Sequence, residues 1–190
     1  MRLLQSRLQF RFRWILLIGL FASLLLIQVP FLRLGAANED MEPIVRVASI
    51  STGQTIEVLE AGSTMGKGVR LLGIDAPDTR QLPWGEAATQ ALQARLAGQT
   101  VRLEFDQERE DAYGRTLAYV WLGDTLVNEA MVAEGFVLAS GRSPADHSAN
   151  TRYALRLADA QEAARLLHRG IWNPAQPLRQ LPRDFRRELE

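Results

Sequence analysis

The chain has 190 residues, with 22 lysines and arginines, 22 aspartates and glutamates, and no cysteine. The lack of cysteine excludes disulfides, thiolate catalysis and cysteine-based zinc sites. Residues 1–37 hold five arginines and no acidic residue, so residues 38–190 carry a net charge of about −5. A domain with this net negative charge is not typical of a general nucleic-acid binder. An anionic substrate would have to be bound by arginines clustered locally on its surface.

Residues 1–37 have the pattern of a targeting segment. Four arginines precede an apolar run over residues 14–32, and small residues at 35–37 offer a site for a signal peptidase. The run also has about the length that can span a bilayer. A cleaved signal peptide and an uncleaved membrane anchor therefore both stay open. In either case the positive flank predicts that the rest of the chain is exported, as a secreted, periplasmic or membrane-anchored domain.

Periodicity in the remaining sequence predicts five strands and about three helices. The expected strands are 44–50, 55–59, 69–74, 100–106 and 116–122. The expected helices are 84–97, 126–134 and 151–169. Residues 173–190 hold three prolines and many charges, so we expect a loosely held tail. Five strands with a helix after the third suit a small closed barrel of the oligonucleotide-binding (OB) type, although other small α+β folds stay open at this point.

The third expected strand carries a candidate site. Arg70 lies on this strand, and Asp75 and Asp78 follow it on either side of Pro77, which forbids a helix there. A cation beside two carboxylates is often a structural ion pair, but the same set can hold a hard metal ion next to a phosphate. Strict alternation places Arg70 and Asp75 on opposite faces. The strand must therefore bend or end between them, which Gly73 permits.

Several motifs occur in order between residues 44 and 172. They lie at 69–77, 84–87, 111–120, 127–135 and 170–172. Together they resemble the thermonuclease family, the staphylococcal-nuclease-like domain. The resemblance implies a five-stranded OB-fold barrel packed with about three helices, here preceded by the hydrophobic segment. It also implies cleavage of phosphodiester bonds in DNA or RNA with calcium as cofactor. Within the fourth motif, we expect Asn128 to satisfy buried backbone groups.

The resemblance implies roles for individual residues. Arg70 and Arg115 match the two catalytic arginines of the family, whose guanidinium groups bind phosphate oxygens and stabilise the charge that develops on phosphorus. Tyr113 matches a residue near the bound nucleotide, with a turn-packing aromatic as the competing interpretation. Asp75 matches a calcium ligand, and Ala76 would contribute its backbone carbonyl to the same ion.

Two positions depart from the family pattern. Gln54 stands in place of an aspartate ligand and offers a carbonyl oxygen without charge, so calcium should bind weakly. Asp78 stands in place of the glutamate that activates the attacking water. Its stem is one methylene shorter, and a displacement of about 1 Å at such a position can cost roughly 10²-fold in rate.

Two functions therefore stay open. The first is an exported, calcium-dependent nuclease with reduced activity, and an endonuclease is the expected type. The second is a non-catalytic module that keeps the barrel and binds nucleic acid or a protein partner. The joint presence of Arg70, Asp75, Asp78 and Arg115 favours the enzyme, because a binding domain has no chemical need for that set.

Overall fold

The computed structural model describes residues 42–60, 62–140 and 150–189. The expected signal peptide or membrane anchor at 1–37 lies outside these residues. Within the part of the chain that is described, no helix is both long and apolar enough to cross a membrane. By their contacts, residues Glu42–Glu190 form one unit.

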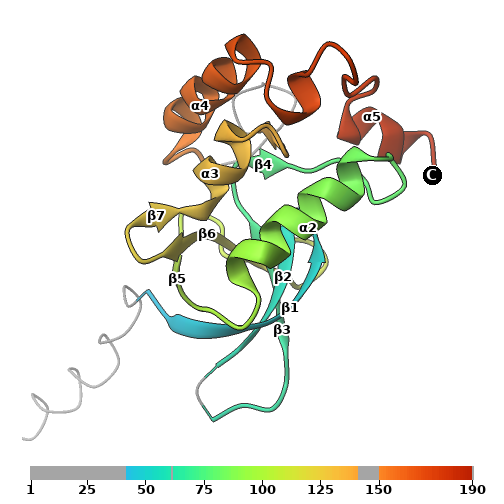
Figure 1. Ribbon diagram of the computed structural model, residues 1–190. Coiled ribbons are helices and arrows are strands. Elements are labelled where there is room, and N and C mark those ends of the chain that lie inside the picture. Colours follow the sequence, from blue (N-terminus) through green and yellow to red (C-terminus); the bar gives the residue numbers. More distant parts are fainter. Residues whose placement is uncertain (1–41, 61, 141–149, 190) are drawn as a thin grey trace, which may run out of the picture. The chain divides into compact units, whose positions relative to one another are not determined.

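Five strands close into a barrel (Figure 1). They are β1 Ile44–Thr52, β2 Thr55–Leu59, β3 Lys67–Leu71, β5 Thr100–Glu104 and β6 Thr116–Leu122. The strands follow one another in the order β3-β2-β1-β5-β6, and a parallel pairing of β3 with β6 closes the ring. The other pairings around the ring are antiparallel. The five-stranded barrel expected from the sequence is confirmed.

Two short pairings lie at the margin of this barrel. β7 Thr125–Leu126 pairs with the outer edge of β6, and β4 Ile74–Asp75 pairs with β8 Leu138–Ala139 in a separate small sheet. The alternation of apolar residues explains the barrel's interior. On β2, for example, Ile56 and Val58 are buried and Glu57 between them is exposed, as expected for a sheet with one face in the core.

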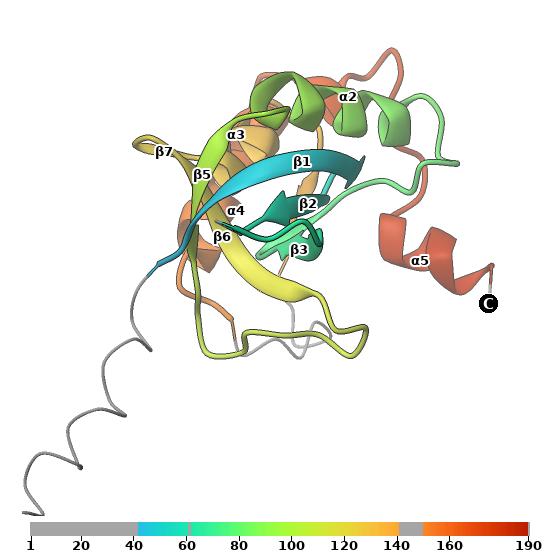
Figure 2. The same ribbon diagram turned by 90° about the horizontal axis from the view of Figure 1, so that it is seen from below.

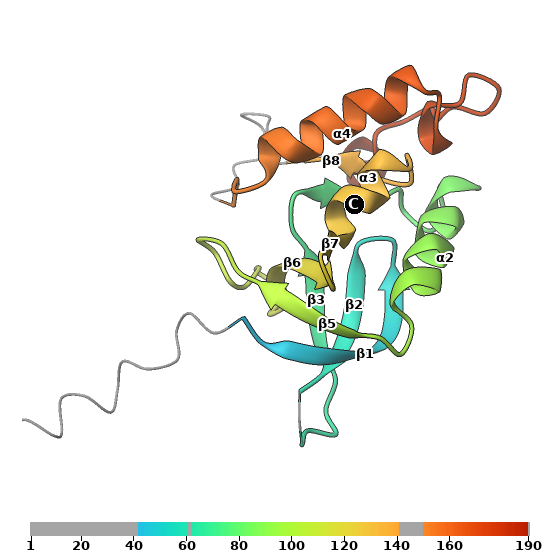
Figure 3. The ribbon, with the colours of Figure 1, turned by 60° about the vertical axis from the view of Figure 1, so that its left-hand side comes forward.

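Three helices of the expected type cover the barrel. They are α2 Trp84–Leu96, α3 Val127–Ala133 and α4 Ala154–Leu166, followed by the 3₁₀ turn η3 Gly170–Trp172. Ala88, Leu92 and Leu96 recur at helical spacing and are fully buried, so α2 packs one face on the barrel. Figure 3 shows α2 along one side of the strands, with α3 and α4 together at another.

The expected strand 69–74 is divided in two by a turn at Gly73. β3 ends at Leu71 and β4 begins at Ile74, and Gly73 has a φ of 71°. A side chain here would also place its Cβ 2.5 Å from Leu157 Cδ1. The positive φ favours glycine here, and any larger residue would also have to displace the Leu157 methyl group. The bend predicted between Arg70 and Asp75 is confirmed.

Asn128 holds this turn in place. Its side chain is fully buried. The Oδ1 atom accepts a hydrogen bond from Val120 N at 2.9 Å, and Nδ2 donates to Leu72 O at 2.7 Å. One amide thus ties α3 to β6 and to the end of β3, and the expected structural role of Asn128 is confirmed.

The tail differs from the loosely held segment that its composition predicts. It contains a further helix, α5 Pro182–Arg187, which Figures 1 and 2 show beside the segment that joins β4 to α2. Two hydrogen bonds hold the chain before α5, from Gln81 Nε2 in that segment to Gln180 O and from Trp84 Nε1 at the start of α2 to Gln176 O, both 3.0 Å. The tail is held by contacts with residues that are distant in sequence. Such contacts cannot be predicted from the composition of the tail.

Replacing Asn128 by alanine should destabilise the protein strongly. Val120 N and Leu72 O would both stay buried without a partner, and each such group costs about 1–3 kcal/mol. We expect a loss of about 2–4 kcal/mol in the free energy of unfolding, measured by urea denaturation.

Asn173→Ala provides the matched control for this measurement. Asn173 is exposed and accepts one hydrogen bond, from Ala175 N at 3.0 Å. Its removal should cost less than about 1 kcal/mol. Equal losses for the two variants would contradict the role assigned to Asn128.

Candidate functional site

Positive charge gathers in one pocket of about 510 Å³. The pocket is lined by Gln54, Arg70, Tyr113, Arg115, Arg183, Arg186 and Arg187, and we call it the arginine pocket. Its lining holds five arginines and no acidic residue, whereas residues 38–190 as a whole are acidic. A recess lined by one sign of charge favours ions of the opposite sign, although Arg115, Arg183, Arg186 and Arg187 each also contact an aspartate outside the lining.

The closure of the barrel brings Arg70 and Arg115 together. In the parallel pair of β3 and β6, Arg70 lies opposite Leu117, and Arg115 directly precedes β6. A Cβ placed on Gly68 would lie 3.5 Å from Arg115 Cγ. Gly68 and Arg70 are two residues apart and therefore share a face of β3. The stem of Arg115 thus passes over the face from which Arg70 projects.

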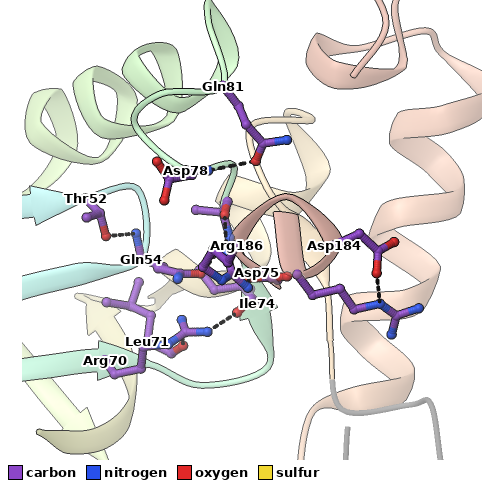
Figure 4. Close-up of polar contacts among 12 residues, drawn as sticks. Thr52, Gln54, Arg70, Leu71, Ile74, Asp75, Asp78, Gln81, Asp184 and Arg186 are labelled. Carbon is purple, nitrogen blue, oxygen red and sulfur yellow. Dashed lines mark hydrogen bonds and ion pairs between the residues drawn. The ribbon is translucent and has the colours of Figure 1, made fainter. Parts of the chain in front are cut away.

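Backbone carbonyls fix the orientation of Arg70. Nη1 donates to Leu71 O at 3.1 Å and Nη2 donates to Ile74 O at 3.0 Å, so the turn that ends β3 holds the guanidinium fork (Figure 4). Burial lowers the pKa of Arg70 to about 10, although the nearby carboxylate of Asp75 opposes the shift. Arg70 therefore stays charged at neutral pH and is held ready for an anion.

Asp111 fixes Arg115, and the sequence-based interpretation gave Asp111 no role. Arg115 Nε donates to Asp111 Oδ2 at 2.7 Å, and Asp111 Oδ1 accepts from the backbone N of Tyr113 and of Arg115. Burial would raise the pKa of Asp111, but the hydrogen bonds from Arg115 and Tyr113 lower it overall. The signal was present in the sequence, because an aspartate three residues before a glycine is typical of a side chain that closes a turn.

Tyr113 lies at the open side of the arginine pocket. It is 85% exposed, and the guanidinium of Arg115 lies 5.4 Å from the centre of its ring. An exposed aromatic ring beside two arginines can stack on a base or on a guanidinium. Tyr113 does not pack into the core, so the turn-packing interpretation loses support.

The expected metal donors lie close together but have other partners. Asp75 Oδ1 accepts a hydrogen bond from Arg186 Nη2 at 2.8 Å, and Ala76 O accepts one from Arg186 Nη1 at 3.4 Å. Gln54 Oε1 accepts from Ala76 N at 2.6 Å. Figure 4 shows the guanidinium of Arg186 among Gln54, Asp75 and Arg70. The structure thus brings the three donors together around an arginine.

These donors do not fit a calcium ion as they are arranged. Calcium takes roughly six to eight oxygen ligands, carboxylates among them. Here Asp75 is the one carboxylate of the expected set, and all three donor oxygens accept hydrogen bonds. Over residues 42–60, 62–140 and 150–189, no group of three or more His, Cys, Asp or Glu side chains is placed to hold a metal.

Asp78 does not line the arginine pocket, although it is near enough to interact electrostatically with Arg186. Both of its carboxylate oxygens bind Arg80, with Nε to Oδ1 at 2.8 Å and Nη2 to Oδ2 at 3.1 Å. Its backbone N donates to Gln81 Oε1 at 3.0 Å. The hydrogen bonds from Arg80 lower the pKa of Asp78. As arranged here, the expected base is held by a neighbouring arginine.

Helix α5 adds three arginines that the sequence-based interpretation missed. Arg183, Arg186 and Arg187 all line the arginine pocket. Their spacing of three and four residues puts them on one helical face, and Pro182 at the first turn is typical of a helix start. That pattern is present in the sequence, but it spans six residues. It is too short to predict a helix in a segment that holds three prolines.

Comparison with known proteins points to one family. Residues 68–174 match the sequence family described as "Staphylococcal nuclease homologue". The chain is 36% identical over 149 residues to a thermonuclease of Staphylococcus hyicus, which covers 76% of this chain and 83% of the relative. It is 37% identical over 131 residues to a thermonuclease of Staphylococcus intermedius, covering 66% and 74%. Endonuclease YncB of Bacillus subtilis is 31% identical over 127 residues, covering 64% and 57%.

The carboxylates of Asp78 and Asp111 should respond separately to loss of their arginine partners. We expect Arg80→Ala to raise the pKa of Asp78 and to leave that of Asp111 unchanged, because Arg80 lowers the pKa of Asp78 alone. Arg115→Ala should do the reverse. The measurement is an NMR titration of the side-chain carboxyl carbons. A shift of both groups in either variant would contradict the separate pairing.

Proposed function

The chain belongs to the staphylococcal nuclease homologue family, and on that premise we propose that it hydrolyses phosphodiester bonds of DNA or RNA in the arginine pocket. The observation that carries the proposal is the convergence of Arg70 on β3 and Arg115 just before β6, two strands that pair when the barrel closes. Relatives named thermonuclease and endonuclease support the same reaction class.

The two arginines have complementary parts in this reaction. Arg70 is anchored by two backbone carbonyls and keeps further N–H groups for a phosphate oxygen. Arg115, oriented by Asp111, approaches the same phosphate from β6. Fixed guanidinium groups stabilise the negative charge that grows on the phosphoryl oxygens in the transition state.

The bond changes are those of a hydrolysis. A water oxygen forms a bond to phosphorus, the ester P–O bond breaks, and the leaving oxygen takes up a proton. The products are a phosphate monoester and a free hydroxyl. Three hydrogen bonds from Arg80 occupy the carboxylate of Asp78, so it can accept the proton of the attacking water through its remaining lone pair or after release of Arg80.

Export is also part of the proposal, because four arginines and no acidic residue precede the apolar run at residues 14–32. Calcium dependence stays a prediction made from the sequence. The donors around Asp75 lend it no support, since each of them has a hydrogen-bond partner from the protein.

One observation favours the second candidate function, a module that binds nucleic acid without cutting it. The carboxylate of Asp78 is held by Arg80 through both oxygens. A pocket of arginines would still bind the phosphates of a single strand, and Tyr113 would still stack on a base. The two functions share the arginine pocket and differ in whether water is activated there.

Substitution of either central arginine tests the enzyme. We expect Arg70→Ala and Arg115→Ala each to lower the turnover of single-stranded DNA by about 10²–10³-fold, as loss of a transition-state donor does. The thermal melting temperatures should stay near that of the parent. The assay follows a labelled oligonucleotide with the full-length chain.

Arg46→Ala is the matched control, because Arg46 is exposed on β1 and does not line the arginine pocket. It should cut at the parent rate. A parent protein that binds the oligonucleotide tightly and never cleaves it, in calcium or in chelator, would instead support the binding module.

A further inference from the structure

Arg186 is placed where the expected cation donors converge. Its guanidinium donates to the carboxylate of Asp75 at 2.8 Å and to the carbonyl of Ala76 at 3.4 Å. These are two of the oxygens that a bound cation would ligate. The same side chain lines the arginine pocket together with Arg70 and Arg115. One group therefore touches the cation donors and faces the place proposed for the phosphate.

The charge of the donor set matches a guanidinium better than a divalent ion. Asp75 contributes a single negative charge, and its side chain is only 15% exposed. Ala76 and Gln54 contribute neutral oxygens, and Gln54 Oε1 is occupied by Ala76 N. Without substrate, a divalent ion in this set would keep an unbalanced charge, whereas one guanidinium neutralises one carboxylate and supplies the donors for the carbonyl.

The position of α5 explains how this residue reaches the site. Gln180, just before the helix, accepts a hydrogen bond from Gln81, and Pro182 at the start of the helix is buried. The tail is thus attached to the segment between β4 and α2 before it reaches Arg186. Arg183 and Arg187, on the same face of α5, line the arginine pocket as well.

We propose that Arg186 takes the place and the electrostatic role of a metal cation at this site, bridging the carboxylate of Asp75 to the substrate phosphate. The protein then cleaves nucleic acid without calcium and depends on its C-terminal helix for activity. This inference rests on the function proposed above. The bonds made and broken are those of the hydrolysis already described, and Arg186 contributes charge and hydrogen bonds only.

The test compares the parent with Arg186→Ala, Arg186→Lys and Arg179→Ala, all in the full-length chain in detergent. Cleavage of a single-stranded DNA oligonucleotide is measured in calcium and in chelator. The parent should cut equally well in both. Arg186→Ala should lose about 10²-fold or more in turnover, and calcium should not restore it. Arg186→Lys keeps the positive charge and should lose only about 10-fold, since an ammonium lacks the planar fork.

Arg179→Ala is the matched control from the same tail. Arg179 is exposed and does not line the arginine pocket, so this variant should cut at the parent rate. Melting curves of all variants show whether they fold. If Arg186→Ala unfolds, the comparison uses Arg186→Lys instead. The proposal would then be overturned if Arg186→Lys cleaves at the parent rate and its cleavage requires calcium.

Two readouts do not depend on cleavage and so separate this inference from the proposed function. Titration of the parent with calcium should give no binding heat and no rise in melting temperature. Oligonucleotide binding in chelator should lose about 0.7 from its log–log salt slope in Arg186→Ala, the value for one phosphate contact on a single strand. If the parent never cleaves the oligonucleotide, the proposed function is refuted. The calcium titration and the salt slope would then still test whether Arg186 takes the place of a cation.

Three results would overturn the inference directly. Arg186→Ala with the turnover and salt slope of the parent would show that Arg186 does not touch the phosphate. Calcium binding by the parent with a clear rise in melting temperature would show that a metal takes the site. A gain of calcium-dependent cleavage in Arg186→Ala would show that the side chain blocks a metal site and does not replace the metal.

Discussion

The parallel pairing of β3 with β6 is the constraint on which the site depends. It closes the barrel, and it aligns Arg70 on one strand with the residues that follow Arg115 on the other. Parallel neighbours cannot be joined by a tight turn, so residues far apart in sequence meet here. Asn128 then locks the end of β3 through Leu72 O. A guanidinium held by this closed, hydrogen-bonded barrel needs little reorganisation to bind a phosphate. Donors that are already in position stabilise developing negative charge without that cost.

The distribution of charge also depends on how the strands and α5 are arranged. The chain after the N-terminal segment carries a net negative charge, yet five arginines line one pocket. Two of these arginines come from the barrel and three from α5. A net negative charge disfavours unspecific attachment to a polyanion, while the arginines favour a phosphate locally in the pocket, as the proposed function requires. Binding one phosphate in a pocket, and not many phosphates along an extended basic surface, suits a site that must position one bond for cleavage.

Sequence patterns predicted the parts of the fold that repeat, and they failed where single long-range contacts decide. The five strands, the three longer helices and the bend at Gly73 follow from periodicity and from glycine chemistry. The motifs also indicated Arg70 and Arg115. The pairs β4 with β8 and β6 with β7 involve two-residue strands that carry no measurable period. The partner of Asp75 lies 111 residues away in sequence, so no local pattern around Asp75 could indicate Arg186.

The six residues of α5 are too few to form a stable helix by themselves, because the cost of nucleation exceeds what so short a segment regains. The helix therefore owes its presence to its contacts with the rest of the domain, and the ion pair between Arg186 and Asp75 on β4 is one of these. The same contact that holds α5 in place also neutralises the one carboxylate of the expected cation donors. Docking of the tail and completion of the site are thus a single event, since the arginine pocket acquires three of its five arginines only when α5 lies on the barrel. A metal ion would have joined the site independently of the tail, whereas a guanidinium makes the C-terminal helix part of the chemistry.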